Sequence, residues 1–371
     1  MIESPLIIPI FLPAAGCRER CLFCNQRASS EGLTSPASVR HFIEASLAQI
    51  PDNKKNREKQ VAFYGGSFTA IHREDQAGYL KEVQPFIASG LVDSIRISTR
   101  PDALDEQTLS LLKEYGVRTI EVGVQSMIDE VLSLACRGHY AGDTVSATRR
   151  LKQWGFEVGH QLMIGLPGDT CDRFLQTLDR VIELNPDFLR IHPTLVLKGA
   201  PLENLWREGR FTPLSIEETI DWLKRGLARL ETSSISIARM GLQPTDELER
   251  NFLAGPYHPA LRQLVDGAIF FDMAMSLLQD SQKHGQALFF CHPKEISNLR
   301  GQKNENILTL KKRFNLSDIF IHGRQELPRG YLGLQTQGEE VSTHRKFLSF
   351  PEMRSGVSTR GEMNDLGQRR M

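Results

Sequence analysis

Six short apolar runs alternate with six segments of helical periodicity over the first two thirds of the chain, and this alternation constrains the fold most. The apolar runs span residues 6–12, 61–64, 94–98, 119–124, 158–164 and 188–196, and the helical segments span 38–50, 74–88, 105–115, 143–154, 172–184 and 216–230. Strands that alternate with helices form a parallel sheet, and strands buried on both faces read as continuous apolar runs. Because six units are too few for the usual eight-fold barrel, the sequence predicts an α/β fold with an open, partial (β/α)6 barrel. A doubly wound sheet is the alternative.

The repeat stops near residue 241, which predicts three parts of the chain. Residues 1–240 form the barrel, residues 241–333 a small α+β extension, and residues 334–371 a polar tail. Within the extension, residues 260–282 have a helical pattern, and residues 287–321 read as strand, loop, helix and strand. The tail has no apolar periodicity, so we expect it to be partly disordered.

Composition excludes several classes of protein. The chain has 371 residues, with 45 Lys and Arg against 45 Asp and Glu, which argues against a uniformly basic polyanion binder. No segment reaches the roughly 20 apolar residues of a membrane span, and no basic region precedes the first apolar stretch. We therefore expect a cytoplasmic protein without a membrane partner, whose thiols stay reduced. A chain of this size needs no disulfides to hold a core, so its six cysteines are free for chemistry.

Three of the cysteines follow the first predicted strand in the sequence GCRERCLFC, which places Cys17, Cys21 and Cys24 at C-x3-C-x2-C spacing. Thiolates from one short loop can hold a soft metal centre, but a closed zinc site needs a fourth protein ligand, and no nearby Cys or His supplies one. Three ligands suit a 4Fe-4S cluster, because such clusters are normally held by four thiolates and the open iron can take a substrate. The pattern favours this cluster, and the alternatives are a zinc loop completed by a distant fourth ligand and three unconnected thiols.

Together with later motifs, this loop resembles the signature of radical S-adenosylmethionine (SAM) enzymes, in which an aromatic residue, here Phe23, precedes the last cysteine. The later motifs are YGGSFTAI at 64–71, ISTRPD at 97–102, EVGVQS at 121–126 and QLMIGLPGDT at 161–170. The segment VLKGAPLENLWREGRFTP at 196–213 also resembles the branch that contains the Elongator catalytic subunit. The resemblance covers roughly residues 5 to 245.

The resemblance implies the residues of a cofactor site. The metal ligands are Cys17, Cys21 and Cys24, and the glycines at the end of the second strand receive the SAM amino group. A bidentate arginine suits the SAM carboxylate, and Arg137 matches that family position. The implied cofactor contacts are Phe23, Gly65, Gly66, Ser67, Ser98, Gln125, Arg137, Gln161, Gly165 and His192. No catalytic residue beyond these is identified.

The resemblance also implies a mechanism. The open iron chelates the amino and carboxylate groups of SAM, and an electron from the reduced cluster cleaves a carbon–sulfur bond. The resulting 5′-deoxyadenosyl radical abstracts hydrogen from a substrate, so the cofactors carry the difficult chemistry and the barrel orients them. We expect a 4Fe-4S cluster, SAM and an external electron donor of the flavodoxin or ferredoxin type.

The substrate is less constrained, and we expect either RNA or a small molecule. The Elongator subunit has an acetyltransferase domain after its barrel, but residues beyond 241 contain no Gly-rich acetyl-CoA loop, so the resemblance is to the barrel alone. The loop RGQKNENI at 300–307 resembles the GXXG element of KH modules, which clamps a nucleic-acid backbone. It lies in a segment, residues 283–329, with nine Lys and Arg against four Asp and Glu. A solvated basic helix is the alternative for this segment, and a non-catalytic metal- or RNA-binding protein with a structural Cys loop is the alternative for the chain.

Overall fold

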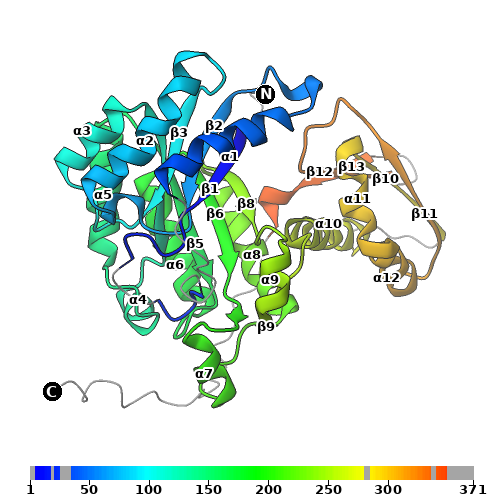
Figure 1. The fold of residues 1–371 in the computed structure, drawn as a ribbon. Coiled ribbons are helices and arrows are strands. Elements are labelled where there is room, and N and C mark those ends of the chain that lie inside the picture. Colours follow the sequence, from blue (N-terminus) through cyan, green and yellow to red (C-terminus); the bar gives the residue numbers. More distant parts are fainter. Residues whose placement is uncertain (1–4, 18–20, 26–34, 280–284, 336–339, 349–371) are drawn as a thin grey trace. The chain divides into compact units, whose positions relative to one another are not determined.

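The computed structural model describes residues 5–17, 21–25, 35–279, 285–335 and 340–348 (Figure 1). The chain divides into two compact units. The first contains Met1–Glu203 and Pro213–Asp266, and the second contains Asn204–Thr212 and Gly267–Met371. The predicted domain boundaries near residues 240 and 333 stay a prediction.

The first unit is built on one seven-stranded parallel sheet. Its strands are β1 (Leu6–Phe11), β2 (Lys59–Tyr64), β3 (Ser94–Thr99), β4 (Val117–Gln125), β5 (Glu157–Ile164), β6 (Phe188–Pro193) and β8 (Ser236–Met240). The strand order in the sheet follows the order in the sequence. A doubly wound sheet reverses its order at a switch point, so this topology excludes the alternative. The predicted α/β partial barrel is confirmed, because the sheet curls into an open half-barrel (Figure 1).

Helices cover the outer face of this sheet (Figure 1). They are α1 (Pro36–Ala48), α2 (Arg73–Ala88), α3 (Glu106–Glu114), α4 (Asp129–Leu134), α5 (Ala141–Gln153), α6 (Cys171–Leu184) and α8 (Ile216–Leu230). Their starts are encoded locally. Ser215 and Glu218 form a capping box at α8, and the Asp105 and Thr170 side chains accept backbone N–H bonds at α3 and α6.

The seventh strand, β8, was not predicted. Its sequence SIARM alternates between exposed and more buried residues, because it lies at the edge of the sheet. The central strand β3 also contains an arginine but is buried along almost its whole length, whereas β8 is half exposed, so its short run has a weaker apolar signal. Four short elements complete the segment between residues 193 and 261. They are the helices α7 (Leu202–Arg207) and α9 (Asp246–Asn251) and the antiparallel strands β7 (Val196–Leu197) and β9 (Phe252–Ala254).

The two faces of the curled sheet differ in chemistry. Side chains alternate along each strand, so Ile95 and Ile97 of β3 point outward and are fully buried under the helices. Between them, Arg96 points to the inner face, where its guanidinium bonds side chains from β2 and β4. The lumen of the half-barrel is therefore polar, and the apolar core lies outside it.

The second unit contains a four-stranded sheet of order β11-β10-β12-β13. β10 (Gly285–Cys291) is parallel to β11 (Leu316–Gly323) and antiparallel to β12 (Tyr331–Gln335), which pairs with β13 (Glu340–His344). The helices α11 (Ile296–Arg300) and α12 (Glu305–Arg313) join β10 to β11, and α10 (Leu261–Gln279) precedes them as one helix. The strands β12 and β13 reach into the predicted tail, whose residues 336–339 and 349–371 lie outside the described residues.

Across the described ranges, no helix is long and apolar enough to cross a membrane. The expected cytoplasmic location stays a prediction.

Candidate functional site

The cysteine loop follows β1 and is fixed by short backbone contacts. Cys17 N–H donates to the Ala14 carbonyl (3.1 Å), and Cys24 N–H donates to the Cys21 carbonyl (3.1 Å). Phe23 packs against an apolar cluster formed by Val131, Ala135, Met163 and Leu166, which anchors the end of the loop. Residues 18–20 lie outside the described residues.

A cavity of about 160 Å³ lies beside this loop at the carboxyl ends of the barrel strands. All three cysteines line it. Eight of the ten predicted cofactor contacts line it as well: Phe23, Gly65, Gly66, Ser67, Ser98, Gln125, Arg137 and Gln161. Carboxyl ends of barrel strands are where this architecture gathers functional side chains, so segments far apart in the sequence meet at one site.

The glycine pair after β2 lets the chain pass directly beside the cysteine loop. A Cβ added at Gly66 would lie 2.2 Å from the carbonyl oxygen of Ala15, closer than atoms can approach. Gly65 has a φ of +103°, a conformation that L side chains rarely adopt. Ser67 N–H then donates to the Ala15 carbonyl (2.7 Å) and ties the two segments together. Larger residues at these positions would displace the loop.

Arg137 connects the cysteine loop to β4. Its Nη1 donates to Cys21 Sγ (3.4 Å) and its Nη2 to the Gly123 carbonyl (2.7 Å). The approach requires glycine at 123, because a Cβ there would lie 2.5 Å from Arg137 Nη2. The remaining Nε of Arg137 is buried without a hydrogen-bond partner. A guanidinium that is bonded on one side and unpaired on the other is a donor available to an anionic ligand.

Gln125 ends β4 in an unusual conformation. Its φ of 64° is in the left-handed region, which costs free energy for a residue other than glycine. Its side chain is buried, and Oε1 has no hydrogen-bond partner. Backbone strain and an unpaired buried acceptor at one residue are typical of a functional site.

The two serines of the cavity are bonded differently. Ser67 Oγ accepts the Arg100 N–H (3.1 Å) and pairs with Thr99 Oγ1 (3.1 Å), so this hydroxyl is used within the fold. Ser98 Oγ donates only a long bond to the Phe63 carbonyl (3.4 Å). Of the two, Ser98 has the hydroxyl that is more easily redirected to a ligand.

Electrostatics around the cysteines depend on burial and on two arginines. Burial raises the pKa of the Cys17 thiol, the neighbouring Cys21 raises it further, and Arg137 and Arg100 act in the opposite direction. Within the described residues, no three Cys, His, Asp or Glu side chains form a group that could hold one metal ion.

The other two predicted contacts, Gly165 and His192, do not line this cavity. Gly165 follows β5 in a left-handed turn (φ +73°), and its N–H donates to Asp169 Oδ2 (3.0 Å). His192 lies near the end of β6, and its buried Nε2 has no hydrogen-bond partner.

The cavity also has residues that were not among the predicted contacts: Ala14, Thr99, Arg100, Glu121 and Gly123. Glu121 was detectable, because it is a charged residue inside an otherwise apolar run. It is 3% exposed and accepts bonds from Arg96 Nη1 (2.7 Å) and the Tyr64 hydroxyl (2.8 Å). A buried carboxylate is retained only when it is paired, so its partners lie in the lumen with it.

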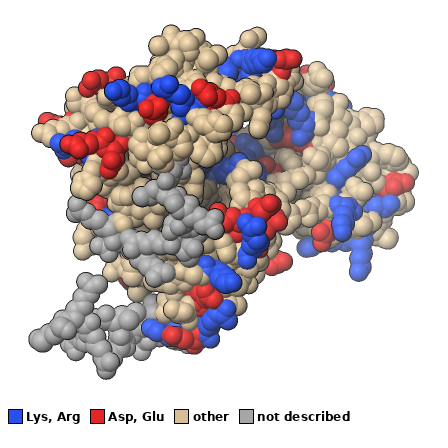
Figure 2. Space-filling view, viewed as in Figure 1, with Lys and Arg blue, Asp and Glu red and all other residues tan. Residues whose placement is uncertain are grey.

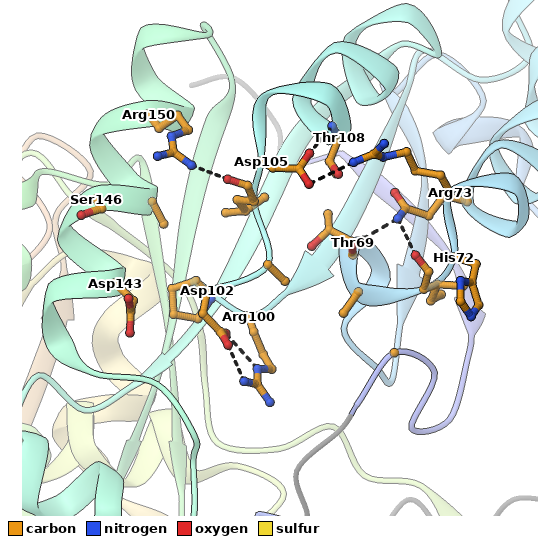
Figure 3. Close-up of a pocket in the computed structure, with 18 residues that line it drawn as sticks. Thr69, His72, Arg73, Arg100, Asp102, Asp105, Thr108, Asp143, Ser146 and Arg150 are labelled. Atoms are coloured by element: carbon orange, nitrogen blue, oxygen red, sulfur yellow. Dashed lines mark hydrogen bonds and ion pairs between the residues drawn. The ribbon is translucent and has the colours of Figure 1, made fainter.

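A larger cleft of about 840 Å³ lies beside the site and shares Arg100 with it (Figure 3). Its charged groups are bonded to the protein. Arg100 forms two bonds to the Asp102 carboxylate (2.9 and 2.5 Å), and Arg150 donates to the Leu104 carbonyl (2.5 Å). Among its lining residues, the buried neutral side chain of Gln76 has an Oε1 without a hydrogen-bond partner.

Comparisons with known proteins identify the family. The model described as the radical SAM superfamily matches residues 11–181, and the model described as the radical SAM C-terminal domain matches residues 186–269. A tRNA uridine(34) acetyltransferase of Methanocaldococcus infernus is 36% identical over 128 residues, which are 34% of this chain and 24% of the relative. Protein YhcC of Escherichia coli K12 is 30% identical over 206 residues, covering 54% of this chain and 64% of the relative. Elongator complex protein 3 of Bos taurus is 34% identical over 210 residues, covering 51% and 38%.

The chain spans only part of these relatives, between 24% and 64% of their length. Among solved structures, the archaeal Elp3 of Methanocaldococcus infernus with an N-terminal deletion is similar in fold, with a TM-score of 0.58 at 22% identity. The match covers 72% of this chain and 63% of that one. The predicted resemblance is confirmed. The chain belongs to the radical SAM superfamily of enzymes, whose cofactors are a 4Fe-4S cluster and SAM, and its barrel resembles that of the Elongator catalytic subunit.

Proposed function

We propose that Cys17, Cys21 and Cys24 hold a 4Fe-4S cluster and that the adjoining cavity binds SAM at the open iron. The observation that carries the proposal is that all three cysteines and eight of the ten predicted contacts line one cavity. In such a cluster each thiolate binds a different iron. Three thiols from one loop leave a structural zinc ion one ligand short of four, whereas they suit a cluster with one open iron.

The remaining side chains of the cavity fit a zwitterionic ligand such as the methionyl end of SAM. The unpaired Arg137 Nε is a donor for a carboxylate, and the unpaired Gln125 Oε1 is an acceptor for an ammonium or hydroxyl group. Gly65 and Gly66 leave backbone exposed to the ligand, and Ser98 adds an adjustable hydroxyl. Ser67, whose hydroxyl is bonded to Thr99 and Arg100, positions the glycine turn.

When bound, the cluster and SAM supply reductive cleavage of a carbon–sulfur bond and a 5′-deoxyadenosyl radical that abstracts hydrogen from carbon. The chain's own residues orient the reactants at the strand ends and hold the cysteine loop in place. An external electron donor is implied by the family, and we propose a flavodoxin- or ferredoxin-type protein.

The test is anaerobic reconstitution of the full chain, followed by iron, sulfide and zinc analysis and an assay for 5′-deoxyadenosine with dithionite. We expect about four irons and four sulfides per chain. Cys21→Ala loses the cluster and SAM cleavage, whereas Cys171→Ala, a matched change of a buried cysteine in α6, retains both. Stoichiometric zinc without sulfide, or a fully loaded cluster that releases no 5′-deoxyadenosine, contradicts the proposal and favours a structural Cys loop.

We further propose that the substrate is RNA. Two observations support this choice over a small metabolite. Relatives of the barrel are named as tRNA uridine(34) acetyltransferases. In the second unit, Lys and Arg gather over α11 and α12 (Figure 2). Arg300 and Lys303 are exposed at the predicted KH-like loop, and Lys312 is exposed in the last turn of α12. The loop Gly301–Asn304 joins the two helices, with Lys303 and Asn304 both in left-handed conformations.

RNA binding is tested with a double substitution and a control of equal charge. Lys303→Ala/Lys312→Ala is compared with Lys54→Ala/Lys55→Ala, whose lysines are exposed on the charged loop before β2. In a gel-shift titration with bulk tRNA, the first variant binds several-fold more weakly. The log–log slope of its salt dependence falls by about 0.7–0.9 for each phosphate that the variant no longer neutralises. Equal, weak binding by both variants and by the wild type favours a small-molecule substrate.

A further inference from the structure

The lumen of the half-barrel contains a pair of arginines that face each other without a shared acid between them. Arg190 of β6 is in register with Arg239 of β8, and paired residues of neighbouring parallel strands point to the same face. Arg190 is bonded to lumen side chains, which fixes that face as the inner one. Like charges directly opposite on adjacent strands destabilise a sheet. The pair therefore needs a compensating negative charge.

Protein carboxylates supply only part of that charge. Glu121 forms an ion pair with Arg190, whose Nε lies 3.0 Å from Glu121 Oε2 without hydrogen-bond geometry. The other carboxylate oxygen of Glu121 already accepts from Arg96 and from Tyr64. Further down the lumen, Glu157 accepts the Thr119 hydroxyl. Among the residues that the structure describes, Arg239 has no carboxylate within ion-pair distance.

His192 adds a second unpaired group to this part of the lumen. It follows Arg190 by two residues and so points to the same face of β6. Its Nε2 is buried without a hydrogen-bond partner. Burial, together with Arg190 and Arg239, lowers the pKa of His192 to about 4, so the ring is neutral at neutral pH. A neutral imidazole beside two guanidinium groups can donate a hydrogen bond to an anion.

The arginine pair is continuous with the proposed cofactor site. Glu121, which contacts Arg190, also lines the 160 Å³ cavity beside the cysteine loop. Gln161 of β5 lines the cavity as well, and β5 pairs with β6 through Gln161 and Arg190. A ligand held at Arg239 and Arg190 would therefore lie in the same lumen as the bound cofactors, toward the edge strand β8.

We propose that Arg190, Arg239 and His192 form an oxyanion site that binds a carboxylate or phosphate group of the substrate. Guanidinium groups recognise both anions through paired, charge-assisted hydrogen bonds, and a partly buried site strengthens them. This proposal rests on the proposed function in one respect: the bound anion is assigned to the substrate of the radical SAM reaction. Anion binding itself needs neither SAM nor turnover, so the two proposals fail separately.

The experiment uses the anaerobically prepared, cluster-loaded full chain without SAM. Inorganic phosphate and succinate are titrated separately at constant ionic strength, by calorimetry and by the shift in melting temperature. We expect saturable binding of at least one of these anions and a raised melting temperature. A preference for phosphate points to a phosphorylated or nucleotide substrate, and a preference for succinate points to a carboxylate.

Two variants of the unpaired arginine separate binding from structure. Arg239→Gln loses tenfold or more in anion affinity, and Arg239→Lys loses less because it keeps the charge. Without anion, the melting temperature of Arg239→Gln equals or exceeds that of wild type, because repulsion with Arg190 is removed. Arg229→Gln, an exposed arginine of α8 paired with Asp179, binds as wild type.

Two results overturn the proposal. One is anion binding that is absent in the wild type or unchanged in Arg239→Gln. The other is a melting temperature of anion-free Arg239→Gln well below that of wild type, since that result assigns Arg239 a structural role.

Discussion

Two buried glutamines on the inner face of the barrel differ in how their side chains are bonded. Gln60 on β2 donates to Ser94 Oγ (3.1 Å) and Thr119 Oγ1 (3.2 Å) and accepts from Arg96 Nε (2.8 Å). Gln125, at the end of β4, has an unpaired Oε1 and a left-handed backbone. A buried polar group without a partner costs free energy, so an unpaired group that lines a cavity indicates a role in ligand binding. We therefore interpret the Gln60 network as structural and the strand ends as the part of the lumen that binds ligands.

The largest expected loss of folding stability comes from breaking the buried ion pair in the lower lumen. Arg96→Leu leaves the Glu121 carboxylate buried without its 2.7 Å partner, and the loss of one member of a buried pair costs about 3–5 kcal/mol. Arg118→Leu, on the same strand as Glu121 but in an exposed ion pair with Glu58, costs less than about 1 kcal/mol. Denaturant unfolding measures both values. Similar costs for the two variants would show that the lumen network does not hold the barrel.

The next largest expected effect is a loss of SAM cleavage caused by a substitution at the strand ends. Gly66→Ala pushes a Cβ into the Ala15 carbonyl and displaces the cysteine loop. A shift of about 1 Å at a reacting centre can reduce a rate about 100-fold, and we expect at least that loss in 5′-deoxyadenosine release. Gly142→Ala in α5 is the control, because its added Cβ meets nothing within 4 Å. Full SAM cleavage by Gly66→Ala would remove the glycine turn from the proposed site.

The sequence predicted the architecture because the central strands are apolar on one face and short-range helix signals separate them. Residues such as Ile95 and Ile97 are fully buried, so their strand reads as an apolar run even though Arg96 lies between them. The edge strand β8 has no such signal, because only one neighbour covers it and its residues alternate in exposure. Because β8 itself was not predicted, the proposed role of its Arg239 in anion binding could not be predicted either.

The candidate site was predictable where a local pattern specifies a local shape. The cysteine spacing and the Gly65-Gly66 pair are of this kind, and these residues line one cavity. Positions whose role depends on distant strands were less predictable. Glu121 was missed as a cavity residue because its partners, Tyr64, Arg96 and Arg190, come from three other strands. His192 was placed at the SAM site from its strand position alone, and it lies outside that cavity.

A smaller change in stability is expected when Gln60 and Gln125 are each replaced by leucine, and this pair of variants compares the two glutamines directly. Gln60→Leu leaves Ser94, Thr119 and Arg96 without a shared partner and costs about 1–3 kcal/mol. Gln125→Leu removes an unpaired acceptor, so unfolding free energy stays within about 0.5 kcal/mol of wild type. SAM affinity, measured by equilibrium dialysis on cluster-loaded protein, falls only for Gln125→Leu. Loss of stability at Gln125 with unchanged SAM affinity would reverse the two assignments.

The smallest expected effect is a pH dependence of stability due to His160 of β5, which contacts α5 on the outer face of the sheet. Thr148 Oγ1 donates to the Thr144 carbonyl (2.7 Å) and lies 2.8 Å from His160 Nε2, so Nε2 carries the proton and donates to it. The other nitrogen, Nδ1, is buried without a partner. Protonation at Nδ1 is therefore unfavourable, and burial lowers the pKa of His160 to about 3.

This lowered pKa makes folding sensitive to acid. Between the ordinary pKa of about 6.5 and the folded value of about 3, the unfolded chain binds a proton at His160 that the folded chain does not. Stability due to this group is present above pH ~6.5 and is lost as pH falls, with a slope that approaches about 1.4 kcal/mol per pH unit between pH ~5.5 and the folded pKa. Denaturant unfolding at pH 6.5, 6.0 and 5.5 gives the slope, which is about 1 kcal/mol per pH unit over this range for one site. His160→Gln reduces this slope, and the exposed His41→Gln retains it. Equal slopes in the two variants would mean that His160 is charged in the fold and that its unpaired nitrogen finds a partner.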